Sequence, residues 1–179
     1  MLSTKVVLVT GGSRGIGASI SRRMADEGYA VAINYVERSD TADALVKELN
    51  DEGKQALAIK CDVSQADDVN HMFNQVEATL GKIDVLINNA GIMALAKIED
   101  SHEDLFDKHI AINLKGTFNT LKEASSRLEK GGRIINLSSS VTCLKPENYG
   151  VYAATKSAIE TLTCILSKEL CGKEITVNA

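Results

Sequence analysis

Residues 5–17 read Lys-Val-Val-Leu-Val-Thr-Gly-Gly-Ser-Arg-Gly-Ile-Gly, a short apolar run followed directly by a glycine-rich turn. The run has the length and composition of a buried strand. Gly11, Gly15 and Gly17 let the backbone turn tightly and approach a ligand closely. The amide groups at the start of the helix that should follow favour a negatively charged group. The stretch therefore predicts a phosphate-binding loop between a strand and a helix.

Strand-like and helix-like segments alternate along the rest of the chain with short connections. We expect strands at 30–35, 56–60, 83–88 and 132–138 and from 175 onward, with long helices at 103–128 and 151–170. This alternation predicts a Rossmann fold, a doubly wound parallel α/β sheet with helices on both faces. No linker or repeat interrupts it, so residues 1–179 are expected to form a single domain.

The composition favours a soluble cytoplasmic protein over one that binds nucleic acid or a membrane. The 179 residues include 20 Lys and Arg against 24 Asp and Glu, a formal net charge of −4, and there is no long basic run. No apolar stretch has the length of a signal peptide or a membrane span. The four cysteines lack zinc-type spacing, so we expect reduced thiols and no metal site.

Tyr152 and Lys156 are four residues apart in a predicted helix, which places a phenol and an ammonium on one face. A nearby cation favours the charged form of a tyrosine and makes it a better proton carrier at neutral pH. Many solvated helices carry the same spacing, so the pair becomes informative only together with the glycine loop. Tyr149 has no lysine four residues later.

Read in order, five motifs resemble those of the classical branch of the short-chain dehydrogenase/reductase family, and the likeness covers nearly the whole chain. Ser139 is chosen over Ser138 and Ser140 because it follows Asn136-Leu137-Ser138 and precedes Tyr152 by thirteen residues. The motifs are Thr10 to Gly17 as TGxxxGIG, Asn88-Asn89-Ala90-Gly91 as NNAG, Asn113 of the central helix, Ser139 after the fifth strand, and Tyr152 with Lys156 as YxxxK.

The resemblance implies a nicotinamide cofactor, and the choice between NADP(H) and NAD(H) depends on the residues near the adenosine ribose. An acidic residue at the end of the second strand binds the ribose in NAD enzymes, but Tyr35 occupies that position here. Arg14 and Arg38 stand where basic residues accept the 2′-phosphate. Glu37 is close to them and opposes this interpretation. We expect NADP(H), with NAD(H) as the alternative.

The full cofactor-binding set implied by the resemblance joins the glycine loop, the ends of the second and third strands, the NNAG motif and the tyrosine–lysine pair. Asp62 is the candidate adenine contact, although an aspartate at this place also suits a helix N-terminus. The set is Gly11, Ser13, Arg14, Gly15, Ile16, Gly17, Tyr35, Arg38, Asp62, Val63, Asn89, Ala90, Gly91, Tyr152 and Lys156.

The implied reaction is reversible hydride transfer between the nicotinamide and a carbonyl or secondary alcohol. Tyr152 would donate the proton, and Ser139 would hold and polarise the carbonyl oxygen. Lys156 would tune the tyrosine and bind the nicotinamide ribose, while Asn113 would anchor a water, unless it only satisfies backbone groups at a helix kink. A 3-oxoacyl-carrier-protein reductase is the best-known relative of similar pattern. A non-catalytic NADP(H)-binding module is the competing interpretation.

Members of this branch run to about 250 residues, and the present sequence ends after the start of the sixth strand. We therefore expect the substrate-covering segment of the family to be missing, either because the protein continues or because the polypeptide is shortened. The family also implies a homodimer or homotetramer built on the helices that carry Asn113 and Tyr152. Phe118, Leu121, Leu162 and Ile165 are the candidate apolar contacts, with packing of each against its own sheet as the alternative.

Overall fold

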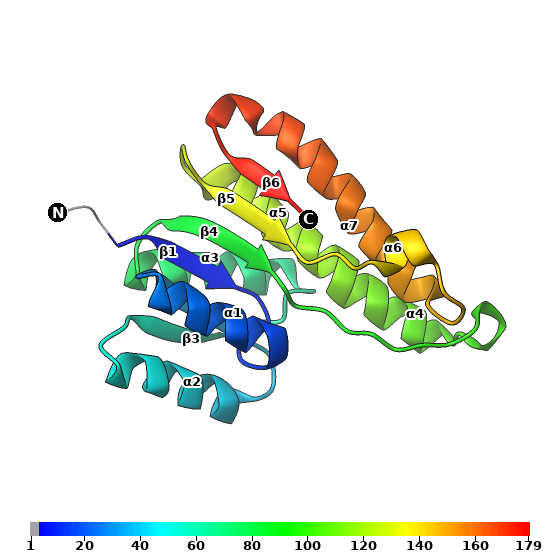
Figure 1. The fold of residues 1–179 in the computed structure, drawn as a ribbon, viewed down its shortest axis with the longest axis horizontal. Helices are drawn as coiled ribbons and strands as arrows, with labels where there is room; N and C mark the ends of the chain where they lie inside the picture. Colours follow the sequence, from blue (N-terminus) through cyan, green and yellow to red (C-terminus); the bar gives the residue numbers. More distant parts are fainter. Residues whose placement is uncertain (1–3) are drawn as a thin grey trace.

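The computed structural model describes residues 4–179 and contains one parallel sheet in the order β3-β2-β1-β4-β5-β6 (Figure 1). All its strand pairs are parallel, for example Val7 of β1 with Val31 of β2 and with Val85 of β4, and the β1–β4 register shifts between Val6 and Val7. The strands are β1 (Val6–Val9), β2 (Ala30–Tyr35), β3 (Ala56–Lys60), β4 (Ile83–Asn88), β5 (Arg133–Asn136) and β6 (Thr176–Asn178). This order confirms the predicted Rossmann fold.

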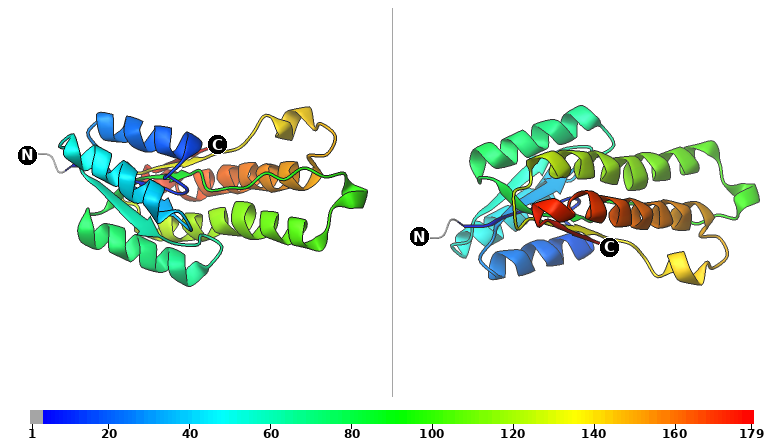
Figure 2. Two further views of the ribbon diagram at one scale, coloured as in Figure 1. Left: turned by 90° about the horizontal axis from the view of Figure 1, so that it is seen from below. Right: turned by 90° about the horizontal axis from the view of Figure 1, so that it is seen from above.

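Helices cover both faces of the sheet, as the edge-on views show (Figure 2). α1 (Gly15–Asp26) and α2 (Ser39–Asp51) lie on one face. α3 (Ala66–Thr79), α5 (Gly116–Arg127) and α7 (Gly150–Glu169) lie on the other. α4 (Glu103–His109) precedes α5, and the four-residue α6 (Val141–Leu144) follows β5. Short 3₁₀ turns occupy Ile98–Asp100 and Cys171–Lys173.

Alternate residues of the strands divide between two apolar cores, which is why β1 is a continuous apolar run. Val6 and Leu8 pack with the helices α3, α5 and α7, whereas Val7 and Val9 pack with α1 and α2. The carboxyl ends of β1 and β4 meet where the strand order reverses. In open α/β sheets, that point is where ligands bind.

The predicted continuous helix over 103–128 was wrong in one respect. Residues Ile110–Lys115 form a π-helical turn between α4 and α5. Such turns insert an extra residue into a helix and are common at functional sites. The turn contains Asn113, which is completely buried. An apolar periodicity continues through such a turn, so the sequence pattern could not reveal it.

A buried chain of side-chain hydrogen bonds ties the ends of β4 and β5 to α5 and α7. Asn88 donates to Asn136 over 2.8 Å, and Asn136 donates to the Thr163 hydroxyl of α7 over 2.8 Å. Thr120 of α5 donates to Asn88 over 2.7 Å. Thr163 in turn donates to the Ile159 carbonyl. Because each member is satisfied, the network fixes the strands relative to the helices.

We expect Thr163→Val to lower the free energy of unfolding by about 1–3 kcal/mol, because it leaves the buried Asn136 amide without its acceptor. Thr161→Val is the matched control, since Thr161 is exposed on the same helix and should change stability by less than about 0.5 kcal/mol. Urea denaturation of both variants measures the difference. Equal free energies of unfolding for Thr163→Val and Thr161→Val would contradict a structural role for the network.

Candidate active site

The glycine loop after β1 is held in place by two asparagines from neighbouring strands. Gly11 donates its backbone N–H to the Asn34 side chain over 3.1 Å. The Asn89 side-chain amide donates to the carbonyls of Thr10 and Gly11 over 2.9 and 3.0 Å. The Thr10 hydroxyl accepts from the backbone amides of Asn89 and Ala90. The glycine loop and the NNAG segment therefore form one hydrogen-bonded unit.

Two glycines of the loop are required by its geometry. Gly11 has a φ of +60°, in the left-handed region. A Cβ atom on Gly17 would lie 2.2 Å from the Gly11 carbonyl oxygen, so no larger residue fits there. Close packing lets the first turn of α1, whose amides lack partners within the helix, face the crevice at the sheet edge. Ser13 and Arg14 lie on the turn just before α1, and Ile16 lies on its first turn; Arg14 and Ile16 are exposed.

Residues predicted to meet the adenosine end lie beyond β2 and β3. Tyr35 ends β2, and its carbonyl accepts from the Cys61 amide over 2.9 Å. Asp62 accepts from the Ser64 amide over 2.9 Å, so it caps the turn before α3 without being the N-cap residue of that helix. Val63 is buried against Gly116, where a Cβ atom would lie 2.6 Å from its side chain.

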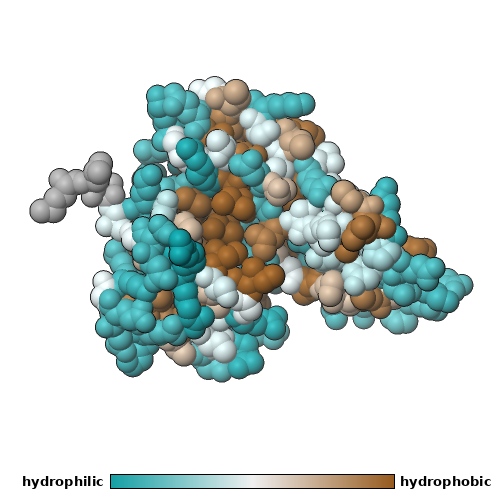
Figure 3. Space-filling model, viewed as in Figure 1, coloured by the Kyte–Doolittle hydropathy of each residue, from teal (hydrophilic) through white to brown (hydrophobic). Residues whose placement is uncertain are grey.

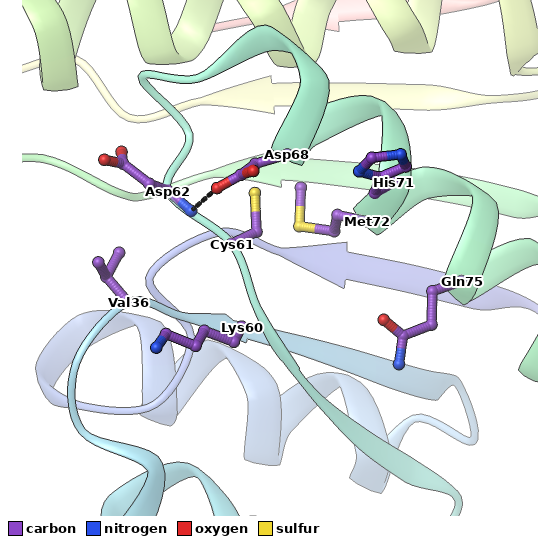
Figure 4. Close-up of a pocket in the computed structure, with 8 residues that line it drawn as sticks. All are labelled: Val36, Lys60, Cys61, Asp62, Asp68, His71, Met72 and Gln75. Atoms are coloured by element: carbon purple, nitrogen blue, oxygen red, sulfur yellow. Dashed lines mark hydrogen bonds between the residues drawn. The ribbon is translucent and has the colours of Figure 1, made fainter.

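A cavity of about 280 Å³ opens beside Asp62, between the end of β3 and α3 (Figure 4). Burial raises the pKa of the Cys61 thiol to about 12, with the nearby carboxylates of Asp68 and Asp62 adding to the shift. The thiol is thus protonated and chemically inert at neutral pH. The cavity is lined by Val36, Lys60, Cys61, Asp62, Asp68, His71, Met72 and Gln75.

The two arginines expected to bind phosphate are both exposed. Arg38 forms a double hydrogen bond with Asp40, with both nitrogen–oxygen distances at 3.1 Å. The Asp40 carboxylate raises the pKa of Arg38, and the guanidinium lowers the pKa of Asp40. Glu37 was the carboxylate expected to oppose phosphate binding, but the structure pairs Arg38 with Asp40 instead. Exposed pairs of this kind contribute little to stability, so another anion can replace the carboxylate.

Lys156 links α7, which also carries Tyr152, to the segment after β5 that leads to Ser139. Lys156 is 5% exposed, and its ammonium donates to the Leu137 carbonyl over 2.6 Å. The same nitrogen lies 5.8 Å from the centre of the Tyr152 ring. Burial lowers the pKa of Lys156 because the charged form loses water. The structure thus places the ammonium beside both Tyr152 and the segment that leads to Ser139.

Ser139 differs from its neighbours in what its hydroxyl contacts. Ser138 donates to the Glu160 carboxylate over 2.6 Å. The Ser139 hydroxyl oxygen accepts a long bond from the Val141 amide, 3.4 Å, and in the described residues it donates to no acceptor. Its proton can therefore be given to a ligand. Ser138, whose hydroxyl is engaged by Glu160, has no such free proton.

Asn113 holds the segment after the NNAG motif. Its side chain accepts from the Ile92 amide over 2.8 Å and donates to the Ile92 carbonyl over 2.9 Å. It also lies 3.2 Å from the Thr155 hydroxyl. A Cβ atom on Gly91 would be 3.3 Å from the Asn113 oxygen and 3.8 Å from the Lys156 nitrogen. Gly91, Asn113 and Lys156 therefore meet at one point.

Two residues of the site carry no signal in the sequence analysis. His109 is completely buried, and its ring nitrogens contact the Leu105 carbonyl at 2.7 Å and the Ala94 amide at 3.1 Å. The ring also meets the Tyr152 ring edge-on, with centres 6.5 Å apart. The other residue is Glu160, whose carboxylate accepts from the Ser138 hydroxyl next to Ser139. A single histidine or glutamate on a helix looks like any other without the fold.

Comparison with known proteins decides the family. The short chain dehydrogenase family profile matches residues 5–179. This chain belongs to the short-chain dehydrogenase family. It is 41% identical to the 3-oxoacyl-[acyl-carrier-protein] reductase of Staphylococcus aureus over 181 residues, which cover 100% of this chain and 74% of the relative.

Solved structures of short-chain dehydrogenases and reductases superimpose closely on this fold. A dehydrogenase/reductase from Sinorhizobium meliloti has a TM-score of 0.95 at 39% identity, covering 99% of this chain and 71% of that one. A short chain dehydrogenase from Burkholderia cenocepacia, solved in complex with NADP, has a TM-score of 0.94 at 35% identity, covering 99% and 73%. The chain is accordingly an oxidoreductase.

Three further features of this short-chain dehydrogenase concern membrane spans, cysteines and exposed apolar side chains. In residues 4–179 no helix is long and apolar enough to cross a membrane. All four cysteines are free, and Cys61 is the buried one. On the face seen in Figure 3, apolar side chains are exposed in the region of α1 and β5, where Ile16 and Ile135 lie.

Proposed function

We propose that this short-chain dehydrogenase is an NADP(H)-dependent carbonyl reductase whose active site consists of Asn113, Ser139, Tyr152 and Lys156. The observation that carries this proposal is the position of the Lys156 ammonium. It lies beside the Tyr152 ring and binds the carbonyl of Leu137, two residues before Ser139. A proton donor, a cation and a hydroxyl with a proton to give therefore flank one edge of the crevice.

The crevice suits a dinucleotide because Gly11 and Gly17 leave the backbone free of side chains at the start of α1. The amides of residues 13–17 would hold the pyrophosphate. Asp62, Val63 and the NNAG residues Asn89, Ala90 and Gly91 would line the path from adenine to nicotinamide. When bound, NADP(H) supplies or accepts the hydride.

In the reduction direction, Tyr152 would donate its phenolic proton to the carbonyl oxygen as the carbon is reduced. Ser139 would donate a hydrogen bond to the same oxygen and stabilise its developing charge. Lys156 would hold the segment before Ser139 and favour the phenolate that remains. Asn113 would fix Ile92, because its side chain is engaged there. The Asn113 backbone carbonyl accepts from the Thr117 hydroxyl, and its second lone pair would be free to bind the expected water.

NADP(H) is favoured over NAD(H) by Tyr35 in place of an acidic residue and by the exposed Arg14 and Arg38. The solved complex with NADP of the Burkholderia cenocepacia relative supports the same choice. A narrower function, reduction of 3-oxoacyl groups on a carrier protein, is supported by the 41% identity to the Staphylococcus aureus reductase. Assay of 3-oxoacyl thioesters alongside simple aldehydes and ketones distinguishes the two.

Tyr152→Phe tests the proposed acid. We expect turnover to fall about 10²–10⁴-fold while NADPH affinity stays nearly unchanged, because the variant removes only the proton donor. NADPH oxidation at 340 nm and NADPH titration measure the two quantities. A variant that kept more than about a tenth of the wild-type rate would remove Tyr152 from this role.

The double variant Arg14→Ala with Arg38→Ala tests phosphate recognition. NADPH binding should weaken far more than NADH binding, since each charge-assisted hydrogen bond contributes about 1.5–3 kcal/mol. Arg23→Ala is a suitable control, because Arg23 is exposed on α1 and pairs with Glu27. Equal losses for both cofactors in titration calorimetry would show that the arginines do not read the 2′-phosphate.

We also propose a homo-oligomer, a dimer or a tetramer, in which the outer faces of α5 and α7 pair across a two-fold axis. Phe118 and Ile165 support this, since they are 49% and 50% exposed on these helices. For the other two candidates the alternative holds: Leu121 is buried in the core, and the partly buried Leu162 packs against the core from α7. Sedimentation velocity should show a dimer or larger at micromolar concentration. It should also show a shift to monomer for Phe118→Ser with Ile165→Ser, whereas a monomeric wild type would contradict the proposal.

A further inference from the structure

One face of α7 is bonded step by step to the end of β5 and the loop that follows it. Thr163 accepts from the Asn136 side chain, Glu160 from the Ser138 hydroxyl, and Lys156 donates to the Leu137 carbonyl. These helix residues lie four and three positions apart, so they share one face with Tyr152. Residues 136 to 138 are thus each tied to α7, and Ser139 comes next.

Glu160 makes the last of these ties. A single oxygen of its carboxylate lies 2.6 Å from the Ser138 hydroxyl and 3.0 Å from the Thr142 hydroxyl. The Thr142 hydroxyl also lies 2.9 Å from the Ser139 carbonyl. The carboxylate therefore contacts the residue before Ser139 and the residue three positions after it. Hydrogen bonds to a charged acceptor are about twice as strong as neutral ones.

The consequence for Ser139 is that its own side chain is left free while its backbone is held from both sides. The hydroxyl donates to nothing in the described residues, as shown above. A hydroxyl that polarises a substrate must be placed without being used by the protein itself. In this loop, Ser138 and Thr142 take up the anchoring bonds, and α6 begins directly after Ser140.

We propose that Glu160 is a positioning residue of the reductase. Its carboxylate binds Ser138 and Thr142 and thereby sets the place of the Ser139 hydroxyl relative to Tyr152 and Lys156. The proposal rests on the proposed function for its catalytic consequence. The anchoring itself does not depend on that function. Glu160 touches no reacting atom in this scheme and acts through Ser139.

Glu160→Ala tests the proposal by steady-state kinetics. The kcat for carbonyl reduction should fall about 10- to 100-fold, because small misplacements of a catalytic group are costly. The KM for NADPH should stay unchanged, since the loop is distant from the glycine cradle in sequence and bonding. Glu160→Gln keeps an acceptor oxygen and should restore kcat to within about threefold of wild type. Glu169→Ala, exposed on the same helix, is the control and should leave kcat unchanged.

Ser138→Ala breaks the same bond from the other side. The double variant Ser138→Ala with Glu160→Ala should be no slower than Glu160→Ala alone, because the two residues act through one contact. The proposal would be contradicted if the two single-variant losses in kcat multiplied in the double variant. It would also be contradicted if Glu160→Ala kept the wild-type kcat. A fall in kcat that Glu160→Gln does not restore would also overturn the acceptor role.

Hydrogen exchange separates this proposal from the proposed function. The amides of residues 142–144 bond within the loop, and they should exchange faster in Glu160→Ala while those of α7 do not. If the wild type reduces no carbonyl but this local change occurs, the reductase function fails and the anchor stands. Unchanged exchange at 142–144 would overturn the anchor whatever the activity.

Discussion

The buried bonds between α7 and the carboxyl ends of β4 and β5 are the constraint on which the site depends. Asn88, Asn136 and Thr163 form a fully paired chain in the interior. Leaving any one of these buried polar groups unpaired would cost more free energy than its hydrogen bond contributes. The network therefore allows one placement of α7 against the sheet. Because Tyr152 and Lys156 lie on α7, the placement of the helix also fixes their positions.

The same constraint explains how a charged lysine is tolerated in the interior. Lys156 loses most of its water, and its pKa is lowered for that reason. The Leu137 carbonyl offers one acceptor at 2.6 Å, and the Tyr152 ring lies 5.8 Å from the same nitrogen. A buried cation that is only partly paired is costly for the fold. Such a cost is typical of a group kept for chemistry rather than for stability.

Much of the fold followed from sequence because its signals are local. The apolar run of β1, the glycine loop and the alternation of strands and helices each act within a few residues, and all were confirmed. The candidate site was predicted as a set of motifs, and it stays a prediction; Tyr152 and Lys156 lie four residues apart on one helix. The π turn at Asn113, the His109 contacts and the Glu160 anchor were not found. Each depends on contacts between segments 15 to 22 residues apart in the sequence, which no periodicity records.

Transfer of hydride to a carbonyl carbon is the most direct measurement of the central claim. The enzyme is incubated with NADPH that carries deuterium at both C4 positions and with a panel of aldehydes, ketones and 3-oxoacyl thioesters, and the products are analysed by mass spectrometry. The account predicts an alcohol one mass unit heavier than the unlabelled product, formed in step with NADPH loss. Tight NADPH binding with no deuterium in any product would contradict it and would leave a cofactor-binding module.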